Sequence, residues 1–119
     1  MSFDHLVDQL RGPSSAIFTP FDSGNEVNLD MLSRLVEFQL AAGLSGFFVA
    51  GSTGEGLLMS EQERATVLRH VVQSVAGRGI VIAHVGHPST DVACRLAKRA
   101  AADGADWIAS VGPVYHGTT

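Results

Sequence analysis

The stretch that decides the fold is FFVAGSTGEGLLMSEQER, residues 47–64. An apolar run leads directly into a loop with three glycines, two hydroxyls and one carboxylate, and a helix start follows. Ser60 and Glu63 have the spacing of a capping box, in which each side chain satisfies a backbone N–H at the beginning of a helix. The stretch therefore predicts a buried strand, a glycine-rich loop and a helix, in that order.

The same order of strand and helix recurs along the chain. The apolar runs are SSAIFTPF, GFFVAG, IVIAHVG and DWIASVG, and the segments between them carry apolar residues at helical spacing. The runs start about 30 residues apart, which is the length of one βα unit. Continuous runs rich in Val, Ile and Phe are typical of parallel strands, so the predicted fold class is α/β. Helices are expected from about Asn28 to Gly43, from Ser60, and from about Ser89 to Gly104.

The predicted organisation is a short N-terminal helix over residues 1–12, followed by strands and helices over residues 13–119. Two architectures fit this pattern: an open doubly wound sheet, and the first half of a (βα)8 TIM barrel. In both, ligands bind at the carboxyl ends of the strands. That rule singles out Thr19 and the loops at 51–56, 84–87 and 112–116.

Composition excludes several classes of function. The chain has 119 residues, 45% of them hydrophobic and 17% charged, with a formal net charge of -4. This balance fits a globular protein and makes nucleic acid an improbable partner. No apolar run approaches the roughly 20 residues needed to span a bilayer, and the N-terminus lacks the positive charge of a signal peptide. With its single cysteine, Cys94, the protein is expected to be cytoplasmic and not bound to a membrane.

The loop GSTGE is the strongest candidate for a binding site. Gly51 and Gly54 allow the backbone to approach a ligand closely, and peptide N–H groups with the hydroxyls of Ser52 and Thr53 can converge on an anionic oxygen. A carboxylate or a phosphate would suit this arrangement. The spacing is not that of a P-loop, because no Gly-Lys-Ser/Thr follows. A tight connection between strand and helix, with local capping only, is the competing explanation.

Aromatic residues give a second set of candidates. Tyr115, the only tyrosine, follows the fourth apolar run and could relay a proton or bond a substrate oxygen, or simply pack there. Phe47, Phe48 and Trp107 are interpreted as core residues or as packing between helix and sheet.

Three histidines also lie at strand ends. His84 and His87 form the sequence HVGH, and His116 follows the fourth run. A metal site needs further ligands, and no carboxylate is close in sequence. We interpret these histidines as hydrogen-bonded core or rim residues and predict no metal site.

Four motifs together resemble a known family. TPF at 19–21, GSTGE at 51–55, IAHVG at 82–86 and SVGPVY at 110–115 resemble, in order and spacing, the dihydrodipicolinate synthase / N-acetylneuraminate lyase family of class I aldolases. The resemblance covers about residues 13–117, and GSTGEG and IAHVG are somewhat closer to the lyase branch. It implies a TIM barrel, usually a homotetramer, in which a lysine forms a Schiff base with pyruvate or another 2-oxo acid. No metal or organic cofactor is implied.

The resemblance also implies roles for particular residues. Ser52 and Thr53 would hold the carboxylate of the 2-oxo acid through hydroxyls and N–H groups, and Ser52 would belong to a proton relay. Gly51, Gly54 and Glu55 would shape the loop. Tyr115 matches the tyrosine that, in synthase-type members, reaches across a dimer interface into the neighbouring site.

The reactive lysine of the family has no counterpart in these residues. Lys98 is the only lysine, and it lies between Arg95 and Arg99 on the polar side of a predicted helix, where nothing would desolvate its amine. In the family the lysine lies on the sixth strand and a second tyrosine on the fifth. The sequence is therefore expected to be the N-terminal portion of such an aldolase, inactive alone. Two alternatives are a non-catalytic half-barrel that binds a small carboxylate or docks on a partner chain, and an unrelated doubly wound domain that binds phosphate.

Overall fold

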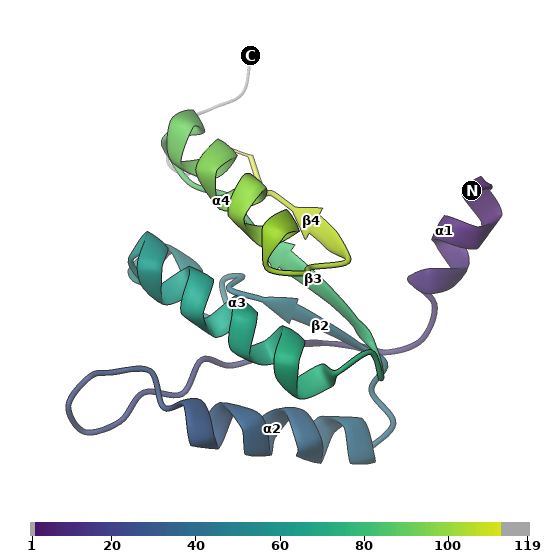
Figure 1. The fold of residues 1–119 in the computed structure, drawn as a ribbon, viewed down its shortest axis with the longest axis horizontal. Helices are drawn as coiled ribbons and strands as arrows, with labels where there is room; N and C mark the ends of the chain where they lie inside the picture. The colour runs from purple at the N-terminus through teal and green to yellow at the C-terminus, as the bar shows by residue number, and fades with distance from the viewer. Residues whose placement is uncertain (1, 113–119) are drawn as a thin grey trace.

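The computed structural model describes residues 2–112, which form one parallel sheet and its helices (Figure 1). The predicted α/β class and its four strands are confirmed. In chain order the elements are α1 (Phe3–Gln9), β1 (Ser14–Ala16), α2 (Leu29–Ala41), β2 (Gly46–Val49), the 3-10 helix η1 (Gly56–Leu58), α3 (Glu61–Val75), β3 (Ile80–His84), α4 (Thr90–Ala102) and β4 (Trp107–Ala109).

The three long helices begin where their capping residues predict. The side chains of Asn28, Ser60 and Ser89 each accept a hydrogen bond from the backbone N–H three residues further on. At α3 the capping box is complete, because the Glu63 carboxylate also accepts from the Ser60 N–H at 3.0 Å. Such caps satisfy N–H groups that have no partner inside the helix, and each contributes about 1 kcal/mol.

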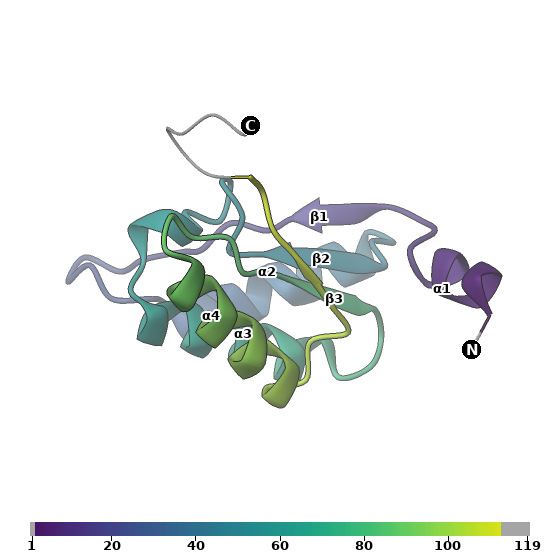
Figure 2. The same cartoon turned by 90° about the horizontal axis from the view of Figure 1, so that it is seen from above.

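The order of the strands decides between the two predicted architectures. The strands pair in parallel in the order β1-β2-β3-β4. Helices α2, α3 and α4 lie on the same face of the sheet, with α3 between the other two (Figure 2). A doubly wound sheet would reverse its strand order and carry helices on both faces. Sequential strands with helices on one face are the geometry of a (βα)8 barrel, of which these elements form the first part.

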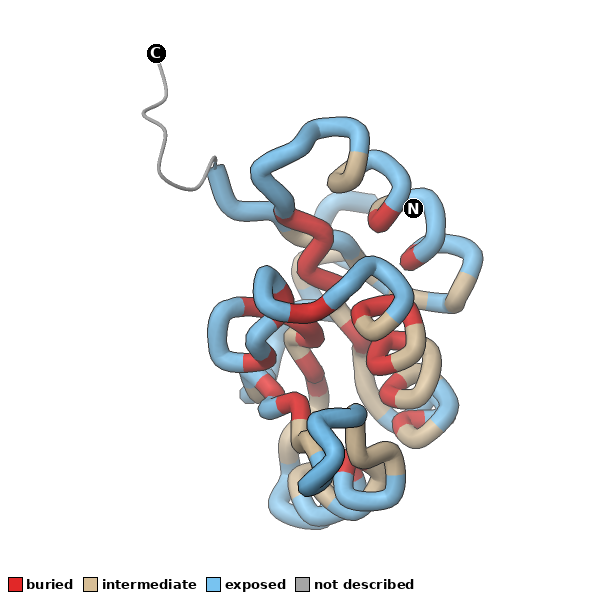
Figure 3. Tube along the Cα trace, turned by 90° about the vertical axis from the view of Figure 1, so that its left-hand side faces the viewer, coloured by how far each residue is buried: buried red, intermediate tan, exposed pale blue. Residues whose placement is uncertain are grey.

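The hydrophobic core lies between the sheet and these helices (Figure 3). Its largest fully buried side chains come from the segment after β1, from β2, and from α2 and α3: Ile17, Leu32, Val36, Phe47, Val49, Val67, Val71 and Val75. Burying one such side chain stabilises the fold by about 1.5–3 kcal/mol. The packing of the helices on the sheet therefore holds the strands in position, and the loops at their carboxyl ends are held with them.

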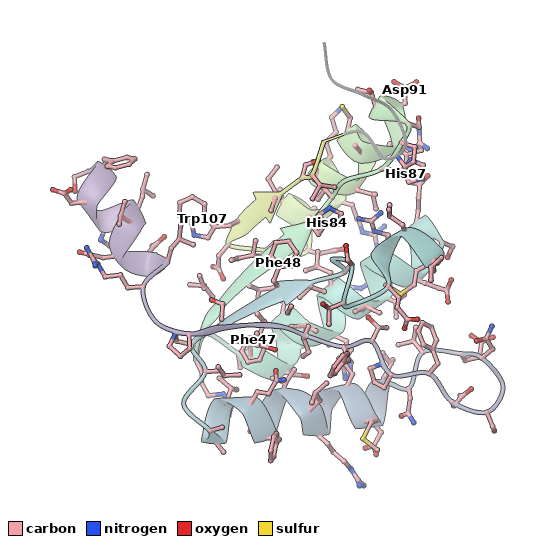
Figure 4. All side chains as sticks on the ribbon, turned by 180° about the vertical axis from the view of Figure 1, so that it is seen from behind. Phe47, Phe48, His84, His87, Asp91 and Trp107 are labelled. Carbon is pink, nitrogen blue, oxygen red and sulfur yellow. The ribbon has the colours of Figure 1, made fainter. Side chains whose placement is uncertain are left out.

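The opposite face of the sheet carries a second set of aromatic residues. The register pairs Phe48 with Ile82 and Ile82 with Trp107. Figure 4 shows Phe48, His84 and Trp107 from behind the sheet. The ring of Phe48 packs against the ring of His84, with their centroids 5.9 Å apart. Successive residues of a strand point to opposite faces, so Phe47 joins the core as predicted, while Phe48 does not. The interpretation of Phe48 and Trp107 as core residues or as packing between helix and sheet was wrong, because neither belongs to the core cluster or packs against it.

Helix α1 stands apart from the sheet and its helices (Figure 2). None of its residues is buried, and the aromatic side chain of Phe3 is 78% exposed. No helix within residues 2–112 is long and apolar enough to cross a membrane.

Candidate anion-binding site

The glycine-rich loop begins with a sharp change of backbone direction. Strand β2 ends at Val49, and Ala50 then adopts a left-handed conformation with φ of 59°. Glu55 has the same unusual φ and precedes η1. Left-handed residues with a Cβ cost about 1 kcal/mol or more, and they persist where the surroundings hold them. The loop from Ala50 to Glu55 is therefore a constrained feature of the fold.

Two internal hydrogen bonds close this loop. The N–H of Gly56 donates to the Gly51 carbonyl at 3.0 Å, and the N–H of Glu55 donates to the Ser52 carbonyl at 3.1 Å. Only glycine fits at position 56, because a Cβ there would overlap the carbonyl of Ala50. The carbonyls of Gly51 and Ser52 are therefore used within the loop itself.

The remaining backbone amides of the loop are free. Among the described residues, the N–H groups of Gly51, Ser52, Thr53 and Gly54 have no hydrogen-bond acceptor. The side chains of Ser52 and Thr53 are exposed, and their hydroxyls make no hydrogen bond within residues 2–112. Four consecutive donors and two hydroxyls at the carboxyl edge of a parallel sheet can bind one anionic group. The structure thus brings together the four loop residues that the sequence predicted.

A threonine in the segment after β1 holds the loop in place. The hydroxyl of Thr19, which is 5% exposed, donates to the Gly54 carbonyl at 2.7 Å. The two residues are 35 positions apart, so this bond joins the connection after β1 to the loop after β2. Sequence reasoning had placed Thr19 at the correct edge but had given it no role.

His84 contacts the same loop from the other side. This residue ends β3 and is 6% exposed, and its Nδ1 lies 3.0 Å from the carbonyl oxygen of Ala50. Burial lowers the pKa of His84, with the positive charge of Arg64 acting in the same direction and the Ala50 carbonyl opposing it. The prediction that His84 is a hydrogen-bonded core residue is confirmed.

Arg64 of α3 is the residue that sequence reasoning missed. It is only 3% exposed, and its guanidinium donates to the carbonyls of His84 at 2.7 Å and Gly86 at 3.0 Å. Burial lowers its pKa, and the nearby Glu61 opposes this shift. The apolar spacing of α3 could have identified it. Arg64 precedes Val67, Leu68 and Val71 by three, four and seven positions, so it lies on the buried face of the helix.

The other candidates lie elsewhere. His87 is exposed, and its Nδ1 accepts from the Ser89 N–H at 2.9 Å at the beginning of α4. Within the described part of the chain, no group of three or more His, Cys, Asp and Glu side chains could hold a metal ion. Lys98 is exposed on α4, on the side of the sheet that carries the helices. Tyr115 and His116 lie outside the described residues.

The fold is the first part of an α/β barrel, with a loop of unpaired backbone donors at the carboxyl edge of its sheet. The chain belongs to the Dihydrodipicolinate synthetase family, whose profile matches residues 9–119. The resemblance seen in the sequence is therefore confirmed.

Relatives of two kinds match the chain. An N-acetylneuraminate lyase from Citrobacter koseri is 40% identical over 111 residues, which cover 93% of this chain and 37% of that protein. A crystal structure of a dihydrodipicolinate synthase is 38% identical, with a TM-score of 0.85 over 89% of this chain and 36% of the other. An N-acetylneuraminate lyase structure from Mycoplasma synoviae is 29% identical, with a TM-score of 0.88 over 94% of this chain and 39% of the other. The chain thus spans less than two fifths of the length of each of these relatives.

Proposed function

We propose that this chain forms the carboxylate-binding portion of a class I aldolase or lyase that acts on pyruvate or a related 2-oxo acid. The observation that carries the proposal is the set of free amides from Gly51 to Gly54, accompanied by two exposed hydroxyls. A carboxylate has two oxygens that each accept several hydrogen bonds, so it matches this density of donors. The Ser52 hydroxyl is further assigned to a proton relay, and Thr53 to the carboxylate.

The nucleophile of this reaction is assigned to a lysine outside the 119 residues. Such an amine attacks the 2-oxo carbon, water leaves, and the resulting imine serves as the electron sink, so no metal or organic cofactor is needed. Lys98 is unsuited to this role, because its amine is exposed to solvent on α4 and lies on the helix side of the sheet. Tyr115 is assigned to the interface between two copies, within a homo-oligomer that is a tetramer in the family pattern.

The branch of the family is left open by the comparisons. A lyase relative at 40% identity and a synthase structure at 38% identity match almost equally well. The proposal therefore commits to the chemistry that both branches share, a 2-oxo acid carboxylate bound at GSTGE.

Binding is tested by titrating the ¹⁵N-labelled chain with pyruvate and, separately, with inorganic phosphate. Pyruvate is expected to shift the amide signals of Gly51 to Gly54 saturably. Ser52→Ala and Thr53→Val each remove a hydrogen bond to a charged group, worth about 1.5–3 kcal/mol, and should weaken binding about tenfold or more. Thr90→Val is the matched control, because Thr90 is an exposed threonine at the beginning of α4, outside the GSTGE loop. Preference for phosphate over pyruvate would contradict the proposed carboxylate site.

Catalysis is tested by intact mass after incubation with pyruvate and borohydride, which reduces an imine to a stable amine. The chain and the longest product that its gene encodes are compared. An adduct on the longer product alone supports the aldolase. Binding of pyruvate with an adduct on neither product favours the non-catalytic half-barrel, which is motivated by the presence of Ser52 and Thr53 without a suitable lysine in these residues.

A further inference from the structure

His84 and Arg64 form a buried polar pair directly behind the anion-binding loop, and the proposed chemistry does not use either of them. His84 comes from β3 and Arg64 from α3, and both are at least nine-tenths buried. Each also has a side-chain nitrogen without a partner among the described residues: Nε2 of His84 and Nε of Arg64. Buried polar groups of this kind are costly, so their retention calls for an explanation.

The contacts of His84 determine which ring nitrogen carries the proton. The Ala50 carbonyl can only accept, so at 3.0 Å from Nδ1 it requires a proton on Nδ1. Nη2 of Arg64 lies 3.4 Å from the same nitrogen, a longer contact than its 2.7 Å hydrogen bond to the His84 carbonyl. The arginine therefore orients the backbone of His84, and the neutral ring donates to the loop.

The backbone at Gly86 packs closely against the ring of His84. A Cβ at Gly86 would lie 2.6 Å from Nε2 of His84, so the glycine lets the following loop lie directly on the ring. Arg64 also binds the Gly86 carbonyl at 3.0 Å. The ring is thus enclosed by α3, by the loop after β3, and by Phe48 on β2.

The bond from His84 sets the direction of one peptide in the anion-binding loop. The peptide between Ala50 and Gly51 is planar and trans, so its N–H points opposite to its carbonyl. Because the Ala50 carbonyl points to His84, the Gly51 N–H points away from it. That N–H is the first of the four free amides.

We propose that His84 is a positioning residue: its Nδ1–H bond to the Ala50 carbonyl holds the Gly51 N–H in the orientation that binds the anion, and Arg64 fixes His84 for this task. That the anion is a 2-oxo acid carboxylate rests on the proposed function. The positioning role itself concerns only this chain's own groups.

Three variants separate this role from general packing. His84→Phe keeps a ring beside Phe48 but removes the donor, whereas His84→Asn retains an N–H near the position of Nδ1. His70→Phe is the matched control: Nε2 of His70 lies 2.6 Å from the Ser33 hydroxyl, so the variant removes a histidine hydrogen bond between α2 and α3, away from the loop.

The first readout needs no ligand. Long-range ¹H–¹⁵N spectra of the histidine rings should show the Nδ1–H form for His84 at neutral pH. The amide signals of Gly51 to Gly54 should move in His84→Phe, return toward wild type in His84→Asn, and stay unchanged in His70→Phe. An Nε2–H form in the wild type, or loop signals that do not respond to His84→Phe, would overturn the proposal.

The second readout is the dissociation constant for pyruvate. We expect His84→Phe to raise it about tenfold, the effect of losing one well-oriented donor to a charged group, and His84→Asn to recover most of the affinity. Equal losses in both variants would make His84 a packing residue only. If the wild type binds no pyruvate, the proposed function fails, while the tautomer and the loop signals still decide the positioning role. If His84→Phe does not fold, those wild-type spectra and His84→Asn decide it.

Discussion

Thr19→Val removes one buried hydrogen bond at almost constant volume. The Thr19 hydroxyl donates to the Gly54 carbonyl at 2.7 Å, and both residues are buried. A buried acceptor left without a donor costs about 1–3 kcal/mol, and valine recovers part of this because its methyl group needs no partner, so the net loss should be about 1–2 kcal/mol. For 119 residues the entropy of unfolding is about 0.25 kcal/mol/K, which converts this loss to a fall in Tm of about 4–8 °C.

Thermal unfolding followed by circular dichroism measures the loss, and hydrogen exchange locates it. Exchange at the Glu55 and Gly56 amides should accelerate in Thr19→Val, because their bonds close the loop that Thr19 holds. Thr19→Ser keeps the donor and should leave these amides protected. Thr66→Val, at a half-buried threonine of α3, controls for the substitution itself. Unchanged exchange in Thr19→Val, with a stability within about 0.5 kcal/mol of wild type, would refute the reasoning.

Four further outcomes follow from the same contacts. Gly56→Ala places a methyl group on the Ala50 carbonyl, which is backbone and cannot move aside, so urea unfolding should show a loss of about 3 kcal/mol or prevent folding. Ser60→Ala breaks the capping box with Glu63 and should cost about 1 kcal/mol by the same assay. Because burial lowers the pKa of His84, the folded state favours the neutral ring; its contribution to stability is complete above about pH 6.5 and is lost as the pH falls through the folded-state pKa. Urea midpoints against pH should therefore show a decline on acidification in the wild type that is smaller in His84→Asn. Finally, Lys98→Arg should leave borohydride trapping of pyruvate by the whole gene product unchanged, and a lost adduct would make Lys98 the nucleophile.

Local signals in the sequence predicted most of the fold. Asn28, Ser60 and Ser89 cap their helices through side-chain bonds that span three residues, so the pattern and the structure report the same short-range geometry. The strands were predicted from continuous apolar runs. The burial of Phe47 and the different position of Phe48 follow from strand alternation, which the prediction did not apply to this pair.

The contacts that hold the site could not be predicted in the same way. Thr19 and Gly54 are 35 positions apart, and Ala50 and His84 are 34 apart, so the strand order had to be known before either bond could be assigned. The burial of Arg64 was not expected from its residue type, because arginine is almost never fully buried without a partner such as a carboxylate. Here backbone carbonyls of the next loop replace that carboxylate.

These contacts also indicate which part of the chain supports each step of the proposed reaction. Every hydrogen bond that the structure shows to hold the GSTGE loop comes from residues 19–86: from Thr19 beyond β1, from His84 on β3, and from within the loop. Within residues 2–112, the contacts that hold this loop therefore come from consecutive βα units. If the proposed function holds, carboxylate binding and attack by lysine reside in different parts of the barrel. Affinity for the 2-oxo acid should then survive loss of the lysine, whereas loss of His84 or Thr19 should weaken binding even when the lysine is intact.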